Sequence, residues 1–163
     1  MSMLKAMQRR LQGQREAGFT LIELMVVVLI IAILIAIAIP TFLGARQRAQ
    51  NRAAQSSLRN SLTAAKTVYT DGQDYNDATA AALQAVEPSL VFVAAGTAST
   101  GQNNVSVGSS PAAPAAGTTF AAAALSASGT CYFIRDAIAG GTVYGSTATC
   151  TGTNALTAAA NGW

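Results

Sequence analysis

The sequence predicts an α+β protein in which a long N-terminal α-helix packs on a small C-terminal antiparallel β-domain. Three observations lead to this prediction. Residues 19–39 form an apolar run with a single charge, apolar residues then recur every three or four positions up to residue 70, and short apolar runs near the C-terminus are separated by turn residues. The first two patterns are typical of helices and the third of strands. We therefore expect a leader at 1–18, a helix in two parts at 19–40 and 41–70, and a head domain at 71–163.

Charge sets the leader apart from the rest of the chain. The 163 residues carry 10 basic and 7 acidic side chains, a net charge of +3. Residues 1–18 contain four of the basic residues and one acidic residue, so they account for the whole excess. A basic excess confined to the first residues is typical of a targeting segment. We accordingly predict no specific nucleic-acid surface on the remainder.

The apolar run 19–39 predicts a membrane-spanning helix. At about 1.5 Å per residue its 21 residues extend roughly 31 Å, the thickness of a bilayer's hydrocarbon core. A buried core helix is the alternative, but the small remaining domain would have to cover it on all sides. A conventional secretory signal fits less well, because its apolar region spans only about 7 to 15 residues and is followed by its cleavage site.

Pro40 ends the apolar run, and we predict a helix kink there, because proline removes a backbone hydrogen bond and clashes with the preceding turn. Between residues 41 and 70 small apolar side chains keep the helical spacing, with arginines between them. This pattern predicts an amphipathic helix. Together the two parts make a helix of about 50 residues, far longer than usual in globular proteins. We expect its apolar stripe to be buried partly on its own head domain and partly on other chains.

The head domain is predicted to be mainly a small β-structure. Residues 79–86 predict a short helix, residues 90–93 a strand, and residues 131–134 and 142–144 the two strands of a hairpin. Residues 94–130 have low complexity, because 30 of these 37 residues are Ala, Gly, Ser, Thr or Pro. With so little bulk to bury, we expect this segment to be loop-like, with one strand around residues 105–107.

Cys131 and Cys150 are the two cysteines of the chain, and they flank the predicted hairpin. In an oxidising compartment they would form a disulfide that stabilises the fold by roughly 3 kcal/mol in the chain-entropy model. Two buried free thiols are the alternative. Basic residues are equally frequent on the two sides of the apolar run, so the positive-inside rule gives no orientation. The predicted disulfide favours a cytoplasmic leader and a head domain outside the membrane.

The composition argues against an enzyme. The chain has no histidine, the usual general base and the commonest metal ligand, and its two cysteines are far apart. We predict no catalytic, metal or cofactor site. The adjacent Arg135 and Asp136 are interpreted as a surface ion pair.

The junction from Gly18 to Glu23 reads GFTLIE, with a basic leader before it and the apolar run behind it. It resembles the type IV prepilin motif, and the segments TCYFIRD and ATCTG of the head are similar to pilins of Gram-positive bacteria. The resemblance implies cleavage between Gly18 and Phe19 by a prepilin peptidase and N-methylation of Phe19 by the same enzyme. It implies as partners other copies of the chain, the pilus assembly platform and its ATPase machinery, and the membrane before assembly, with no cofactor.

Glu23 is the charge within the apolar run, where a carboxylate is costly unless it is paired. Its natural partner is the α-amine of Phe19 on its own or a neighbouring chain, which would give Glu23 a role in assembly. An interfacial acid without a partner is the alternative.

The expected function is that of a structural type IV pilus subunit, first in the cytoplasmic membrane and then in an extracellular filament. A pseudopilin of a type II secretion or DNA-uptake system is the first alternative. The other is a single-pass membrane protein with an extracellular binding domain.

Overall fold

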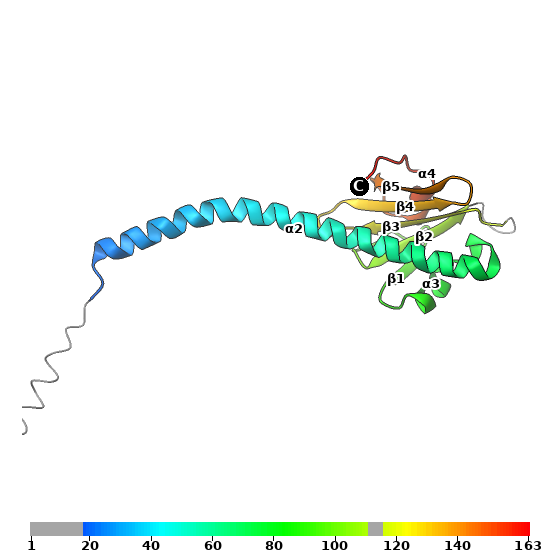
Figure 1. Ribbon diagram of the computed structural model, residues 1–163, viewed down its shortest axis with the longest axis horizontal. Helices are drawn as coiled ribbons and strands as arrows, with labels where there is room; N and C mark the ends of the chain where they lie inside the picture. Colours follow the sequence, from blue (N-terminus) through cyan, green and yellow to red (C-terminus); the bar gives the residue numbers. More distant parts are fainter. Residues whose placement is uncertain (1–17, 111–115) are drawn as a thin grey trace, which may run out of the picture. The chain divides into compact units, whose positions relative to one another are not determined.

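The computed structural model describes residues 18–110 and 116–163. The predicted leader, apart from Gly18, lies outside the described residues. The elements in chain order are α2 (Leu21–Gly72), η1 (Tyr75–Asp77), α3 (Ala80–Val86), β1 (Val91–Ala94), β2 (Asn104–Ser110), β3 (Thr119–Leu125), β4 (Cys131–Ala137), β5 (Gly141–Thr147) and α4 (Gly152–Thr157) (Figure 1). The predicted α+β class is confirmed. The chain forms two compact units, one ending at Leu43 and the other beginning at Gly44.

The first unit contains the apolar part of α2. Its large apolar side chains between Leu21 and Leu43 are all between 48% and 75% exposed. The helix is long and apolar enough to cross a membrane, and none of its most apolar 18-residue window, with a mean hydropathy of 3.3, is buried. A helix that is apolar all round is stable when lipid or other helices surround it.

Pro40 lies inside α2, and the helix continues through it. The next residue supports the backbone at this position, since the hydroxyl of Thr41 donates to the carbonyl oxygens of Ile37 at 3.2 Å and Ala38 at 2.9 Å. Proline therefore does not end the helix, and the kink at Pro40 stays a prediction.

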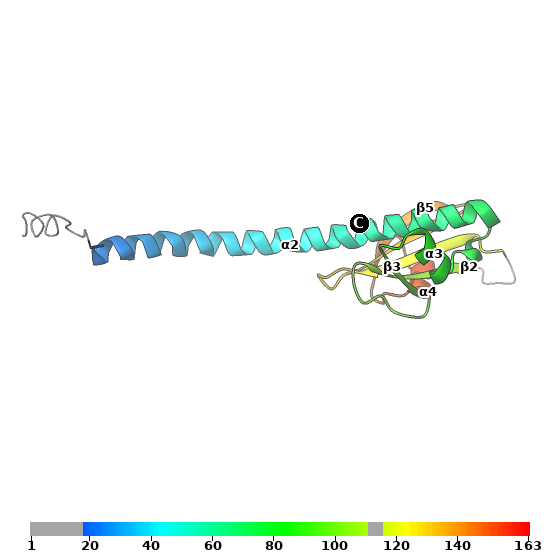
Figure 2. The same ribbon diagram turned by 90° about the horizontal axis from the view of Figure 1, so that it is seen from below.

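The second unit is built on a five-stranded sheet with the strand order β1-β2-β3-β4-β5. β1 and β2 are parallel, and every other neighbouring pair is antiparallel. The sheet lies between two helices, with the second part of α2 on one face and α4 on the other (Figure 2). The predicted short helix and the predicted hairpin correspond to α3 and to β4 with β5.

In the segment 94–130, the strand expected around residues 105–107 is confirmed as β2, but the segment also contains β3 where a loop was expected. β3 is the central strand, and its four successive alanines, 121–124, are completely buried. Ala122 and Ala124 pack in the cluster that includes Leu58 of α2, whereas Ala121 and Ala123 pack in the cluster that includes Ala155 of α4. Methyl side chains on both faces let two helices approach the strand closely. The sequence hides the strand because its two faces have the same residue type.

Both edges of the sheet are covered. At β1, the side chain of Gln84 accepts from the amide of Phe92 at 3.2 Å and donates to the carbonyl of Leu90 at 2.6 Å. At β5, the amide of Gly162 donates to the carbonyl of Tyr144 at 3.1 Å, and the indole of Trp163 donates to the carbonyl of Gly145 at 3.0 Å. Covered edges disfavour the addition of a strand from another chain.

Candidate functional site at the start of the long helix

The junction between Gly18 and Phe19 is open to an approaching protein. Both residues precede the first turn of α2. Among the described residues, no heavy atom lies within 4 Å of the position that a Cβ of Gly18 would occupy, and the side chain of Phe19 is 80% exposed. A peptidase can therefore reach the peptide bond that joins them.

Thr20 and Glu23 form a reciprocal cap at the start of α2. The amide and the hydroxyl of Thr20 donate to Oε2 of Glu23 at 2.8 and 2.7 Å. In return, the amide of Glu23 donates to the hydroxyl of Thr20 at 3.3 Å. This arrangement is a capping box, which satisfies backbone N–H groups that have no partner within the helix. A carboxylate is also favoured at a helix N-terminus, where the helix dipole is positive.

The sequence analysis missed Thr20, although the Thr-x-x-Glu spacing is the signature of a capping box. In the described residues, Glu23 has a partner within its own chain and is not simply an isolated charge. The capping bonds use only one of its two carboxylate oxygens, Oε2. The second oxygen, Oε1, accepts no hydrogen bond from the part of the chain that the structure describes.

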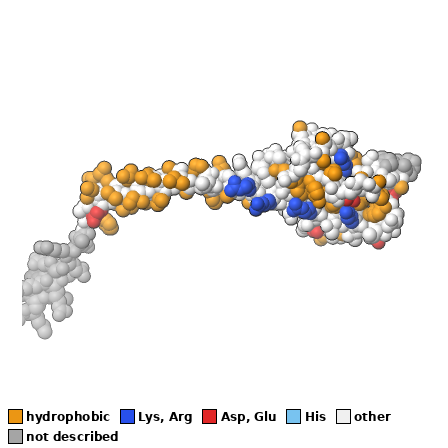
Figure 3. Space-filling model, turned by 45° about the horizontal axis from the view of Figure 1, so that its top comes forward, with side chains coloured by type: hydrophobic (Ala, Val, Ile, Leu, Met, Phe, Trp, Pro, Cys, Tyr) orange, Lys and Arg blue, Asp and Glu red, His pale blue; other side chains and the backbone are white. Residues whose placement is uncertain are grey.

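The side chains around Glu23 form shallow apolar grooves on the helix. One groove, of about 420 Å³, is lined by Phe19, Ile22, Glu23, Val26 and Val27. A second, of about 600 Å³, follows it along the helix and is lined by apolar residues between Ile22 and Ala32. Figure 3 shows apolar side chains covering this part of α2. Such ridges and grooves are the surfaces by which helices pack against one another.

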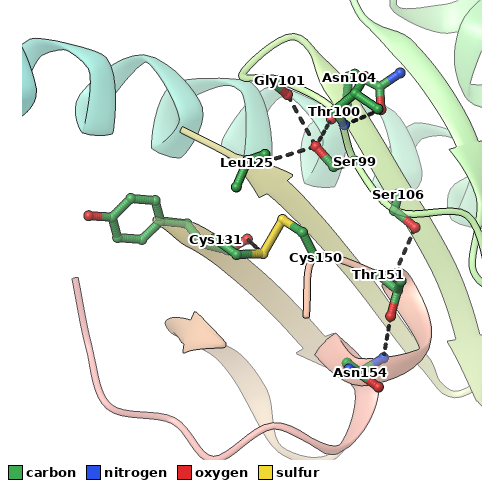
Figure 4. The surroundings of a disulfide bond; sticks show 12 residues. Ser99, Thr100, Gly101, Asn104, Ser106, Leu125, Cys131, Cys150, Thr151 and Asn154 are labelled. Atoms are coloured by element: carbon green, nitrogen blue, oxygen red, sulfur yellow. Dashed lines mark hydrogen bonds between the residues drawn. A yellow bond between two sulfur atoms is a disulfide. The ribbon is translucent and has the colours of Figure 1, made fainter. Parts of the chain in front are cut away.

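The predicted disulfide is present in the second unit. Cys131 at the start of β4 is joined to Cys150, with a Cα–Cα distance of 5.4 Å, and both residues are at most 8% exposed (Figure 4). Hydrogen bonds fix the same segment to its neighbours, since the amide of Ser99 donates to the carbonyl of Cys150 and the amide of Gly152 to the hydroxyl of Ser106, both at 2.8 Å. The disulfide thus anchors the segment that leads into α4.

Asp136 does not form the expected surface pair with Arg135. It is 6% exposed and accepts hydrogen bonds from the hydroxyls of Tyr75, at 2.7 Å, and Thr142, while Nζ of Lys66 lies 3.2 Å away. Alternation along β4 is the reason, because adjacent residues point to opposite faces of a sheet. Arg135 lies on the α4 side and donates to backbone carbonyls at the end of that helix, those of Leu156 and Ala158.

The environment of Asp136 shifts two pKa values. Burial alone would raise the pKa of Asp136, but hydrogen bonds from Thr142, Tyr75 and Lys66 outweigh it and hold that pKa below its ordinary value. Burial and the neighbouring carboxylate raise the pKa of Tyr75 well above its ordinary value. The cluster joins α2, η1, β4 and β5, and we interpret it as structural.

No group of three His, Cys, Asp or Glu side chains in the described ranges is placed to hold a metal ion.

Comparison with protein families gives one match. Residues 13–39 match the model of the prokaryotic N-terminal methylation motif. The motif indicates a protein like a type IV pilin or a pseudopilin, processed by a prepilin peptidase and assembled into filaments, and it is typical of structural proteins and not of enzymes. With the apolar helix, it also indicates a membrane-anchored precursor.

The match ends at residue 39, so it does not extend to the head segments for which a resemblance to pilins of Gram-positive bacteria was expected. No curated protein and no solved structure gives a significant match to the chain.

Proposed function

We propose that the chain is a structural subunit of a type IV pilus that assembles through residues 19–39 into a helical surface filament. The observation that carries this proposal is the exposure of the apolar part of α2, none of which is buried, together with the methylation motif that overlaps it. Lipid covers this surface in the membrane-anchored precursor. In a filament, the apolar segments of other copies take the place of the lipid.

Processing between Gly18 and Phe19 prepares the chain for this exchange. The open backbone at Gly18 gives the peptidase access, and removal of the leader removes the whole net charge of +3. The apolar segment then begins with the methylated amine of Phe19 and can leave the bilayer. The disulfide supports a head domain in an oxidising compartment outside the membrane and a leader in the cytoplasm.

Glu23 selects the axial position of each new subunit. A carboxylate among apolar helices requires a positive partner, and the amine of Phe19 on an adjacent chain reaches it only at one axial height. A buried polar pair fixes the register of coiled coils in the same way. The capping box supports this role, because Thr20 orients the carboxylate through Oε2 and leaves Oε1 for the amine.

Mass spectrometry of the sheared surface fraction tests the proposal. We expect a mature chain that begins at methylated Phe19 and contains the disulfide between Cys131 and Cys150. Electron microscopy should show surface filaments that disappear when the gene is deleted. An extracellular form that still carries residues 1–18 would contradict the proposal, and correct processing without surface filaments would favour a pseudopilin of a type II secretion or DNA-uptake system.

A further inference from the structure

Four basic side chains line one face of α2 in the second unit. We call this set the basic stripe, and its members are Arg48, Arg52, Arg59 and Lys66. They recur after four, seven and seven residues, so all of them lie within about 40° of one helix face. Arg46 lies on the opposite face. Figure 3 shows basic side chains in a row along the helix.

The two halves of the basic stripe differ in their partners. The guanidinium of Arg59 lies 5.0 Å from the ring centre of Trp163, and Lys66 pairs with Asp136. Arg48 and Arg52 are both exposed, and no carboxylate within the described ranges pairs with either of them. Two cations on one helix face are therefore left without an acidic partner among the described residues.

The matching acids lie where α2 ends, with Asp71 in its last turn and Asp77 in η1. Asp71 and Asp77 are exposed, and the carboxylate of Asp77 lies against Gly72, directly beside Asp71. Within the described residues neither carboxylate has a donor or a cation as partner. Asp74 differs from them, because it accepts from the amides of Asn76 and Gly117. We call Asp71 and Asp77 the acidic end.

We propose that Arg48 and Arg52 of one copy contact the acidic end of a second, parallel copy that is displaced along the helix axis. The displacement follows from the separation of 19 positions between Arg52 and Asp71, which corresponds to about 28 Å of helix. Without a displacement, the arginines of two copies would face one another and repel. The contact joins two different surfaces, so the arginines of the second copy and the acidic end of the first copy stay free. Each can bind a further copy, and the contact therefore repeats along an open filament.

The parallel orientation rests on the proposed function. Antiparallel copies would also bring arginines to acids, but their apolar segments would then point in opposite directions. Segments that leave the same membrane and join the same filament core must point the same way. Among the possible occupants of the basic stripe, a second copy is favoured because the chain itself carries the complementary charges at a fixed axial distance.

Charge reversal in the full chain, expressed with its own assembly machinery, tests the contact. Arg48→Glu with Arg52→Glu should lower the yield of sheared filaments about tenfold, because exposed attractions become repulsions at every subunit. Asp71→Lys with Asp77→Lys should do the same, and combining all four changes should restore filaments. Arg46→Glu is the control, since it makes the same substitution once on the opposite face and should leave the yield unchanged, and each of Arg48→Glu and Arg52→Glu alone should lower the yield more than it does.

Cross-linking measures the contact without relying on charge. Arg52→Cys with Asp71→Cys in one chain should give a ladder of oligomers on a non-reducing gel, whereas Arg52→Cys alone should give no dimer. Dimers from Arg52→Cys alone would show copies in register and overturn the proposal. Normal wild-type filaments with no effect of charge reversal would also overturn it, whereas the absence of wild-type filaments would instead contradict the proposed function.

Anionic lipid is the competing occupant of the stripe. If lipid were the occupant, arginine reversal would release the precursor from membranes and the acid reversals would not restore filaments. That result would overturn the contact between copies.

Discussion

Glu23 is held by Thr20 through two hydrogen bonds to the same carboxylate oxygen, at 2.8 and 2.7 Å. The acid therefore caps its own helix before any other chain is present. Capping and pairing make different demands on the side chain, since a cap needs an acceptor oxygen and an ion pair needs the negative charge. Substitutions at residues 20 and 23 can separate the two.

Substitutions of Glu23 should block assembly without affecting the head domain. Glu23→Ala removes the charge and the carboxylate half of the capping box, and we expect it to be cleaved, inserted in the membrane and disulfide-bonded, yet to yield few or no filaments. Glu23→Gln should be nearly as poor, although glutamine can still close a capping box. The measurements are sheared filament yield, mass of the mature chain and protease resistance of the head. Wild-type filament yield from Glu23→Ala would show that the carboxylate has no assembly role.

Thr20→Val should weaken the cap while keeping the charge and the side-chain volume. Loss of the capping bonds costs about 0.5–2 kcal/mol of helix stability at a typical N-cap. We expect a partial loss of filaments, smaller than that of Glu23→Gln, and full recovery in Thr20→Ser, which restores the hydroxyl. Quantitative electron microscopy of Thr20→Val, Thr20→Ser and Glu23→Gln measures the three filament yields and gives their order. Equal yields from Thr20→Val and wild type would show that assembly does not need the oriented carboxylate.

A bulky residue in place of Gly18 should stop processing. A side chain such as that of leucine would stand beside the bond to be cut, where nothing now lies within 4 Å. We expect Gly18→Leu to accumulate in the membrane as uncleaved precursor with an intact disulfide, as judged by its mass. Gly18→Ala, the smallest change, should be processed more slowly than wild type but faster than Gly18→Leu. Normal cleavage of Gly18→Leu would show that processing does not depend on open space beside Gly18.

Loss of the disulfide should loosen the C-terminal part of the head. For a sequence separation of 19 residues, the chain-entropy model gives a stabilisation of about 3 kcal/mol. Cys131→Ser should therefore become sensitive to protease, with cuts concentrated around α4 and the segment before it. Free thiols titrated in the unreduced mature protein would show that the bond does not form in the cell.

Asp136 should make the free energy of unfolding of the head depend on pH in the acidic range. Its pKa is lowered in the folded chain, so its contribution is present above the unfolded value of about 3.9 and is lost as the pH falls toward its folded pKa. Asp136→Asn should cost about 1–3 kcal/mol at neutral pH and flatten this acid dependence. Tyr75→Phe, which keeps the carboxylate of Asp136, should retain more of the acid dependence than Asp136→Asn. Thermal unfolding of the mature protein in detergent between pH 3 and 7 measures the stability and the acid dependence of each variant. Identical acid profiles of wild type and Asp136→Asn would refute the role given to Asp136.

Sequence patterns predicted the elements in which apolar residues recur at a clear helical or strand spacing, or which turn residues clearly bound. The apolar run gave the first part of α2, the spacing of small residues gave its second part, and the short runs 131–134 and 142–144 gave the hairpin of β4 and β5. The patterns failed for β3. Its residues alternate between two buried faces, but four of them in succession are alanine, so the sequence shows no alternation. They also failed for Asp136, because its neighbour Arg135 in sequence is not its neighbour in space.

The covered edges of the sheet bear on how the proposed filaments would behave when many heads stand close together. A filament presents the same head at regular intervals, so an exposed strand edge would meet identical edges on every neighbouring filament. Gln84 and the segment up to Trp163 occupy the backbone groups through which such edges would join. If the chain assembles as proposed, neighbouring filaments would not join through these strands, and side chains on the head surface, which can change without altering the sheet, would govern any bundling.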